Sequence, residues 1–253
     1  MTERLYLETL EHGYATSFHA TVQAVNADEV VLDRTLFYPL GGGQQWDTGV
    51  LSGPNGSLDI TEVRGRTDIA HTVGQGHQLE VGDEVTGTVD WETRYAHMRM
   101  HTAQHVVSGL VYEMFGGART VGNQIRADRS RIDFKPISFD EDMLQSLTAA
   151  VNDRISEGLM VTDSVMTRDD MNAIMPADRT NMDLLPPSVN ELRVIEIGHR
   201  VDMCPCAGTH VTNLAELGPM TIIGKKSKGK GTQRITYELG SASVVRTPNT
   251  QPL

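Results

Sequence analysis

Residues 90–117 read DWETRYAHMRMHTAQHVVSGLVYEMFGG and mark the point where the chain changes from a strand pattern to a helix pattern. Asp90 can cap a helix, because its carboxylate can accept hydrogen bonds from the first free backbone N–H groups. Apolar side chains then recur at the helical period over residues 95–110, and the two glycines at 116–117 are a typical stop. This predicts a helix over residues 91–115.

The chain before this helix has the pattern of an all-β domain. Short runs rich in Val, Ile and Thr lie at residues 20–25, 29–32, 58–63 and 84–89. Eleven of the 24 glycines fall between residues 41 and 87, a density that suits tight turns in a small barrel or sandwich. We therefore expect a β domain over residues 1–89.

The chain after this helix mixes helices and strands. The capping sequence at residues 138–141 and the glycine at 158 bound a second helix, and a short helix is expected at 169–175. Because there is no strand–helix–strand alternation, residues 90–253 are predicted to form an α+β domain. The expected strands are 124–134, 192–197, 220–223 and 233–239, with a break at Pro186-Pro187.

The overall charge is acidic, with 33 Asp and Glu against 22 Lys and Arg and a net charge of −11. Averaged over the surface, this argues against a polyanionic partner. However, four of the five lysines lie in residues 224–234, a segment with no acidic residue. Such a segment is often a solvated turn, but we interpret it as a flexible loop that contacts RNA phosphates. Its lysines are Lys225, Lys226, Lys228 and Lys230.

The cellular location is suggested by what the sequence lacks. Two cysteines cannot form a disulfide framework, and the amino terminus carries charges where a signal peptide would be apolar. The chain also has no apolar stretch approaching the ~18 residues of a membrane span. We expect a cytoplasmic protein with no membrane association.

Two short motifs could together bind one metal ion. His101 and His105 are four residues apart in the predicted helix, so their imidazoles lie on one face. Cys206 and His210 flank a glycine-containing loop that can bring a thiolate and an imidazole to the same point. Three nitrogens and one sulfur suit tetrahedral Zn²⁺ better than Mg²⁺ or Ca²⁺.

Neighbouring residues leave alternatives for this site. His97 lies one turn earlier on the same helix face, and we favour a supporting role for it. Cys204 is an alternative thiolate, although Pro205 makes it hard for both thiolates to point at one ion. Four protein ligands indicate a structural zinc, whereas a catalytic zinc keeps an open position; the sequence leaves both open. A metalloprotease is disfavoured, because Thr102 stands where HExxH has its glutamate.

These motifs resemble those of a known family. HTAQH at 101–105 and CAGTH at 206–210 resemble the HTAxH and CxGTH signatures of the alanyl-tRNA synthetase editing domain and of its freestanding relatives, the alanyl-tRNA editing proteins of AlaX type. FYPLGGGQQWDTG at 37–49 and RIDF at 131–134 are similar to two further motifs of that family. The four motifs occur in the family's order, and the chain resembles the freestanding editors of intermediate length.

The resemblance implies a fold, a reaction and a cofactor. The fold would be a small antiparallel β-barrel over residues 1–89, followed by a zinc-containing α+β editing domain over 90–253. The reaction would be hydrolysis of the ester that joins serine, or glycine, to the acceptor end of tRNA(Ala). In the family the positions of His101, His105, Cys206 and His210 hold the zinc.

Discrimination against alanine requires a group that reads the serine hydroxyl, because serine is the larger of the two amino acids. Alignment on the RIDF strand implies Thr120 for this role, although a β-branched residue opening a strand is the structural alternative. Gln44 is our second catalytic candidate. Gly41, Gly42 and Gly43 would approach the substrate, unless they only form a wide hairpin turn.

Two other functions remain open at this point. Spacing indicates no Ser-His-Asp set and no paired carboxylates, so we expect direct attack by water rather than covalent catalysis. The chain could instead be a zinc-stabilised RNA-binding protein without activity. It could also edit seryl-tRNA(Thr), since the editing domain of threonyl-tRNA synthetase shares the metal motif.

Overall fold

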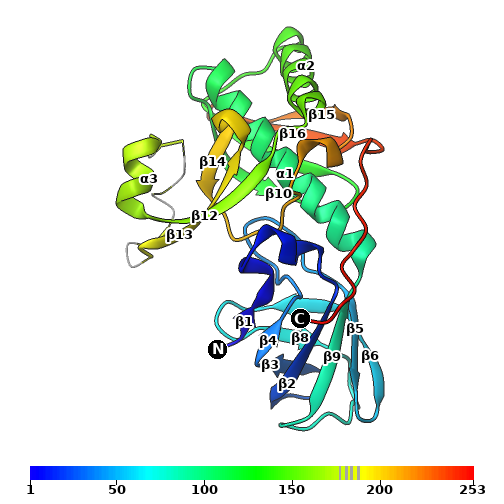
Figure 1. Cartoon of the computed structure of the whole chain (residues 1–253). Helices are drawn as coiled ribbons and strands as arrows, with labels where there is room; N and C mark the ends of the chain where they lie inside the picture. The colour runs from blue at the N-terminus through cyan, green and yellow to red at the C-terminus, as the bar shows by residue number, and fades with distance from the viewer. Residues whose placement is uncertain (177, 180–181, 183–184, 187–188) are drawn as a thin grey trace.

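The computed structural model describes residues 1–176, 178–179, 182, 185–186 and 189–253. Figure 1 shows two halves, a sheet-rich N-terminal half and a mixed half of helices and sheets, with α1 (Trp91–Met114) leading from the first into the second. Both chain ends lie on the N-terminal half. Among the described residues, no helix is long and apolar enough to cross a membrane.

The N-terminal half is one seven-stranded antiparallel sheet in the order β6-β5-β9-β2-β3-β8-β7. β2 changes partner along its length: Ser17–Thr21 pairs with β9, and the part from Val22 onwards pairs with β3, with an irregularity between Val22 and Ala24. The described residues show no pairing between the outer strands β6 and β7, so these ladders do not close the expected barrel. The strands are β2 (Ser17–Val25), β3 (Glu29–Leu32), β5 (Gly49–Gly53), β6 (Gly56–Ile60), β7 (Glu62–Arg64), β8 (Ala70–Thr72) and β9 (Glu84–Val89), beside a short parallel pair of β1 (Glu3–Arg4) and β4 (Arg34–Thr35).

The second half confirms the predicted α+β class. It contains a four-stranded antiparallel sheet, β10-β11-β16-β15, and a three-stranded one, β12-β13-β14. The helices are α1, α2 (Glu141–Glu157) and α3 (Arg168–Ile174). The strands are β10 (Arg119–Gln124), β11 (Ser130–Lys135), β12 (Val161–Thr167), β13 (Glu191–Ile197), β14 (Asp202–Pro205), β15 (Met220–Gly229) and β16 (Thr232–Leu239).

The helix ends follow the capping residues closely. The Asp90 side chain accepts hydrogen bonds from the backbone N–H groups of Glu92 and Thr93, as predicted. The second helix begins two residues later than the capping sequence suggested, because the Asp140 side chain, and not that of Ser138, makes the cap. Gly158 ends it in the left-handed conformation, with φ 61°.

The strand predictions needed correction, first of all between the two long helices. The single strand expected over 124–134 is wrong at its start: the chain forms a hairpin of β10 and β11 that turns between Gln124 and Ser130. A Lys135-Pro136 cis peptide follows the hairpin. Of the break predicted at Pro186-Pro187, Pro187 lies outside the described residues.

The buried apolar side chains form three clusters. One lies inside the N-terminal sheet, one between α1, α2 and the four-stranded sheet, and a small methionine-rich one beside α3. Leu10 and Tyr14, near the amino terminus, belong to the cluster around α1, while Leu253 packs against that of the N-terminal sheet. Each half therefore receives side chains from the far end of the chain.

A buried ion pair joins the two halves at the start of α1. Arg94 is fully buried and donates hydrogen bonds to the Asp47 carboxylate and to the carbonyl oxygens of Gly13 and Leu36. Asp47 also accepts a hydrogen bond from the backbone N–H of Tyr38 at 2.7 Å. The DTG stretch thus fixes the sheet to the helix that carries the two predicted histidine ligands.

Candidate metal centre

The four predicted ligands lie together. His101 and His105 come from one face of α1, and Cys206 and His210 come from the loop after β14. Their ligand atoms lie within 4.8 Å of one another, with Cys206 Sγ 3.6 Å from His101 Nε2 and 3.3 Å from His210 Nε2. A tetrahedral zinc with ordinary Zn–N and Zn–S bond lengths requires ~3.5 Å between N and S. The donor set and its spacing therefore fit such an ion.

Each imidazole is oriented by a partner at its other ring nitrogen. Such outer contacts hold the ring of a metal-binding histidine in place and fix which nitrogen carries the proton. With Nδ1 engaged in this way, Nε2 is left for the centre of the cluster. The contacts are His101 Nδ1 with Gln44 Oε1 at 2.8 Å, His105 Nδ1 with Asp202 Oδ2 at 2.8 Å, and His210 Nδ1 with Thr102 Oγ1 at 3.2 Å.

The loop from Cys206 to His210 is held from outside and packed tightly inside. Arg193 donates hydrogen bonds to the carbonyl oxygens of Cys206 and Gly208 and pairs with Asp163. A Cβ atom at Gly208 would lie 2.1 Å from Cε1 of His101. Only glycine lets this loop approach the helix so closely, which explains the glycine of the motif.

The ionisation of the cluster suits metal binding. Burial acts to raise the pKa of the Cys206 thiol, but His101 and His210 outweigh it and hold that pKa well below its usual range. Burial lowers the pKa of His101 and His210. Burial acts in the same sense on His105, but Cys204 and Asp202 outweigh it and hold the pKa of His105 well above its usual range. Zinc coordinates a thiolate and neutral imidazoles, so Cys206, His101 and His210 favour the binding form and His105 would release a proton on binding.

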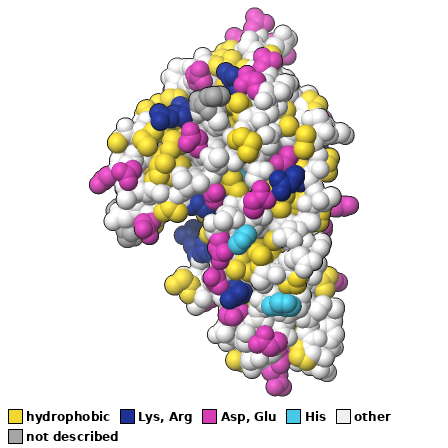
Figure 2. Space-filling view, viewed as in Figure 1, with side chains coloured by type: hydrophobic (Ala, Val, Ile, Leu, Met, Phe, Trp, Pro, Cys, Tyr) yellow, Lys and Arg dark blue, Asp and Glu magenta, His cyan; other side chains and the backbone are white. Residues whose placement is uncertain are grey.

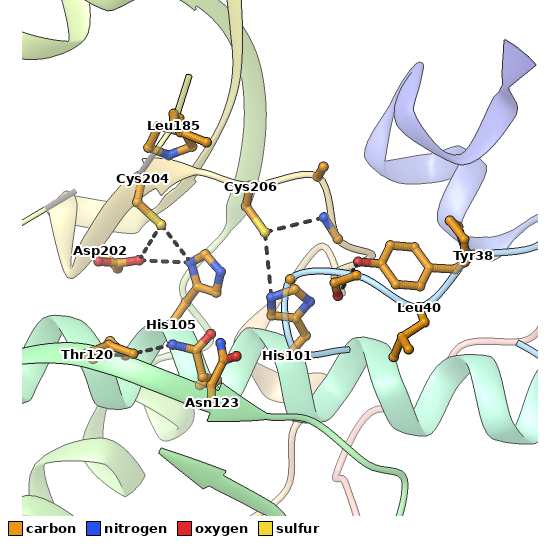
Figure 3. Close-up of a pocket in the computed structure, with 18 of the residues that line it drawn as sticks. Tyr38, Leu40, His101, His105, Thr120, Asn123, Leu185, Asp202, Cys204 and Cys206 are labelled. Carbon is orange, nitrogen blue, oxygen red and sulfur yellow. Dashed lines mark hydrogen bonds and ion pairs between the residues drawn. The ribbon is translucent and has the colours of Figure 1, made fainter. Parts of the chain in front are cut away.

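The two alternative ligands lie outside the four-residue cluster. Cys204 Sγ lies 3.3 Å from Nδ1 of His105 and 3.4 Å from Oδ2 of Asp202, so it contacts the ring on the side away from Nε2 (Figure 3). These three residues form a second group of close ligand atoms. His97 is buried, belongs to neither group, and its Nδ1 has no hydrogen-bond partner among the described residues.

The cluster forms one wall of a cavity of about 460 Å³ that both halves of the molecule line. Tyr38, Leu40 and Thr120 face the same space from the other walls (Figure 3). His101, His105 and Cys206 reach this surface, whereas His210 is not among its lining residues. A molecule in the cavity can therefore reach three of the four candidate ligands, but not His210.

The cavity is rich in arginine although the chain is acidic. Arg4 and Arg66 line it from the N-terminal half, and Arg119 and Arg179 line it from the other half. Asp202 is the one carboxylate among the described lining residues, and it contacts His105. Figure 2 shows basic side chains at the notch between the halves. Such a concentration of positive charge favours an anionic ligand.

The glycine-rich segment reaches the cavity in part. Gly41 and Gly42 line it. Gly43 packs instead against Asn123, where a Cβ atom would lie 1.8 Å from the amide oxygen. Gln44 is fully buried and makes side-chain hydrogen bonds with Thr209 and His101. It lies behind the four candidate metal ligands and is not among the residues that line the cavity.

The lysines lie elsewhere. The flexible loop predicted for them is wrong for most of its length, because Lys225, Lys226 and Lys228 belong to β15 and only Lys230 lies in the turn before β16. Lys225 donates a hydrogen bond to the carbonyl oxygen of Phe139. β15 is three strands from β10, which lines the cavity, a separation of ~14 Å across the sheet.

Two sequence profiles of known protein families match this chain and show the class of protein to which it is related. The sequence profile described as "tRNA synthetases class II (A)" matches residues 6–93, and that of the "Threonyl and Alanyl tRNA synthetase second additional domain" matches residues 192–236. The second match includes Cys206 and His210. The chain, with its α+β second half and its cluster of three histidines and one cysteine, is therefore related to domains of aminoacyl-tRNA synthetases.

Full-length relatives then give the family. The chain is 36% identical over 246 residues to the alanyl-tRNA editing protein AlaX-M of Methanosarcina barkeri, which covers 94% of this chain and 99% of that protein. It is 35% identical over 240 residues to the protein of the same name from Saccharolobus solfataricus, with 94% and 98% covered. It also matches an alanine–tRNA ligase of Methanothrix thermoacetophila, at 35% identity over 97% of this chain but 26% of the ligase. The chain belongs to the family of AlaX-M alanyl-tRNA editing proteins.

Proposed function

We propose that this protein is a zinc-dependent trans-editing hydrolase that removes serine from mischarged tRNA(Ala). Membership of the editing family makes it an aminoacyl-tRNA hydrolase. The observation that carries the proposal is the position of the His101, His105 and Cys206 side chains in the wall of an arginine-rich cavity. We also retain the division at residues 89 and 90, with the glycine-rich segment on one unit and the ligands on the other.

The metal chemistry is assigned to the four clustered residues. His101, His105, Cys206 and His210 would hold zinc, which when bound can polarise an ester carbonyl or lower the pKa of a water. Gln44 is assigned to orienting His101 through Nδ1, a positioning role, rather than to contact with the substrate. We propose direct attack by water on the ester.

The remaining cavity residues are assigned to the substrate. Gly41 and Gly42 present backbone to the aminoacyl end, close to the metal cluster. Thr120, which lines the same cavity, reads the serine hydroxyl. Alanine would leave this polar reader unpaired, which is how a site can reject a substrate smaller than the correct one.

The reaction itself is the first test. We expect the purified protein to deacylate seryl-tRNA(Ala) about 10⁴-fold faster than alanyl-tRNA(Ala), because alanine offers no acceptor to the half-buried Thr120 hydroxyl. Initial rates of amino-acid release from tRNAs charged with serine, glycine and alanine measure this. Seryl-tRNA(Thr) is the matched control for tRNA identity. Equal rates on the two serine-charged tRNAs would remove the tRNA(Ala) assignment, and no release from any of them would leave an RNA-binding protein without activity.

The tRNA acceptor end is assigned to the part of the cavity that Arg4 and Arg66 line. Arg66 is exposed, and neither it nor Arg4 has a carboxylate within ion-pair distance among the described residues. These guanidinium groups can hold phosphates while the aminoacyl group enters the cavity. The lysines of β15 would then contact RNA farther from the ester, and their contribution is separable from that of the arginines.

Salt dependence tests this assignment. Arg66→Ala should weaken tRNA binding and reduce the slope of log affinity against log salt by about one, because one phosphate contact is lost. Arg154→Ala, which removes an exposed arginine of α2, is the control and should leave the slope unchanged. Lys226→Ala measures the β15 contribution separately. An unchanged slope in Arg66→Ala would refute the arginine contact.

A further inference from the structure

Three side chains that line the cavity form a chain of short hydrogen bonds beside the metal cluster. Gln104 Nε2 donates to Ser108 Oγ at 2.7 Å, and Ser108 Oγ lies 2.7 Å from Thr120 Oγ1. All three residues line the cavity, and Gln104 is nearly buried, with 6% of its surface exposed. Neither the four candidate metal ligands nor the glycine-rich segment needs this series of hydrogen bonds to hold its position. The series therefore requires a separate explanation.

The first bond of this series has a fixed direction. The amide nitrogen of Gln104 can only donate, so Ser108 Oγ is the acceptor of that bond. Between Ser108 and Thr120 either hydroxyl can be the donor. When Ser108 donates, the proton of Thr120 is free for a substrate, since no other described atom hydrogen-bonds to the Thr120 hydroxyl.

Resting on the function proposed above, we propose that Gln104 and Ser108 are positioning residues that make Thr120 a hydrogen-bond donor to the serine hydroxyl oxygen of the substrate. The two act through Thr120 and need not touch the substrate. With the hydroxyl held from behind, Thr120 does not rotate to find another partner when alanine occupies the site. Its donor then stays desolvated and unpaired, which disfavours alanine.

These residues share one face of α1. His101, Gln104, His105 and Ser108 follow the three- and four-residue spacing of a helix face. Ser108 lies three residues beyond His105, or ~4.5 Å along the axis of α1. All four line the cavity, so the candidate ligands and the hydroxyl that Ser108 contacts are open to the same bound molecule.

The first experiment removes the link in the middle. Ser108→Ala should reduce the ratio of kcat/KM for seryl-tRNA(Ala) over alanyl-tRNA(Ala) by about tenfold, since one neutral hydrogen bond that fixes the reader is lost. Ser108→Thr, which restores a hydroxyl, should rescue the ratio. Ser57→Ala breaks a similar hydroxyl–hydroxyl bond, Ser52 to Ser57 at 2.8 Å on the distant β5–β6 hairpin, and should not change it. Metal content should stay equal to that of the unmodified protein in all three variants.

A double-mutant cycle separates positioning from a merely structural effect. Thr120→Val should lower the selectivity ratio by about 100-fold or more, because the reader itself is lost. Adding Ser108→Ala to Thr120→Val should then change the ratio no further. Losses that multiply in the double variant would refute the link between the two hydroxyls.

Gln104→Glu tests the direction of the chain. A carboxylate accepts from Ser108, which turns the bonds round and leaves Thr120 donating to Ser108 instead of to the substrate. The selectivity ratio should fall although all side chains keep their size; an unchanged ratio at equal metal content would refute the direction. Failure of the proposed function gives a different result, in which the unmodified protein releases no serine. Failure of the reader alone would leave Thr120→Val as selective as the unmodified protein.

Discussion

If the proposed function holds, replacement of Cys206 by alanine is expected to remove the metal ion and to abolish the proposed deacylation of seryl-tRNA(Ala). Cys206 is the one thiolate of the four-residue cluster, and its Sγ lies 3.6 Å from His101 Nε2 and 3.3 Å from His210 Nε2. Loss of an outer partner of a metal ligand already lowers affinity or activity by about 10–100-fold, so loss of the ligand itself should exceed 100-fold. His105→Ala should behave in the same way.

Cys204→Ala is the matched control for this prediction. Cys204 is two residues away and also contacts a ligand, but at Nδ1 of His105, on the side away from the centre. It should therefore keep one metal ion per chain. Metal analysis of the purified variants and initial rates of serine release give the two readouts. A folded Cys206→Ala protein with full metal content and full activity would refute the assignment, and loss of metal from Cys204→Ala alone would move the site to the second group of ligands.

The four candidate ligands could be predicted from the sequence because helical spacing and a tight loop leave few arrangements. His101 and His105 must share a helix face wherever that helix lies. Their supporting partners could not be predicted in this way. Gln44, Asp202 and Thr102 come from three separate segments, and only the packed chain shows that each meets the Nδ1 of a different histidine.

The local structure of the lysine-rich segment was predicted wrongly for a similar reason, whereas its contact with RNA stays a prediction. The lysines of residues 225–230 are adjacent in the sequence and therefore conspicuous, yet they extend β15 at the far edge of a sheet. The four arginines of the cavity are spread from residue 4 to residue 179, so no window along the chain contains them together. Charged residues that are adjacent in the sequence lie along one strand. The positive charge of the cavity comes instead from arginines in several separate segments of the chain.

Strand boundaries were least predictable where buried and exposed side chains do not alternate clearly along the strand. β10 carries polar residues and a glycine, and most of its side chains are half-buried, so a two-residue period does not stand out. The predicted strand over 124–134 therefore joined the end of β10 to β11 across their turn. β14, with four residues, is too short for a period and was also missed. Thr120, the proposed reader, is on the strand that was misjudged, which is why its partner Ser108 could not be anticipated.

Removal of Arg94 is expected to destabilise the whole chain. Arg94→Met leaves the Asp47 carboxylate buried without its cation, and breaking a buried pair on one side costs about 3–5 kcal/mol. The loss also frees the carbonyl oxygens of Gly13 and Leu36 from their donor. We therefore expect a lower midpoint of urea unfolding and a free energy of unfolding reduced by that amount.

A double variant tests whether the loss of stability comes from the missing Arg94–Asp47 ion pair or from the unpaired Asp47 carboxylate that the single variant leaves buried. Arg94→Met combined with Asp47→Asn removes both charges and keeps an amide oxygen for the backbone N–H of Tyr38, so it should recover part of the lost stability. Arg154→Ala breaks an exposed pair with Glu157 and should change the free energy of unfolding by less than about 1 kcal/mol. If Arg94→Met were no more destabilising than Arg154→Ala, the ion pair could not be what fixes the glycine-rich segment against the metal-bearing helix. The two walls of the cavity would then be held together mainly by other contacts, such as the packing of Gly43 against Asn123 of β10.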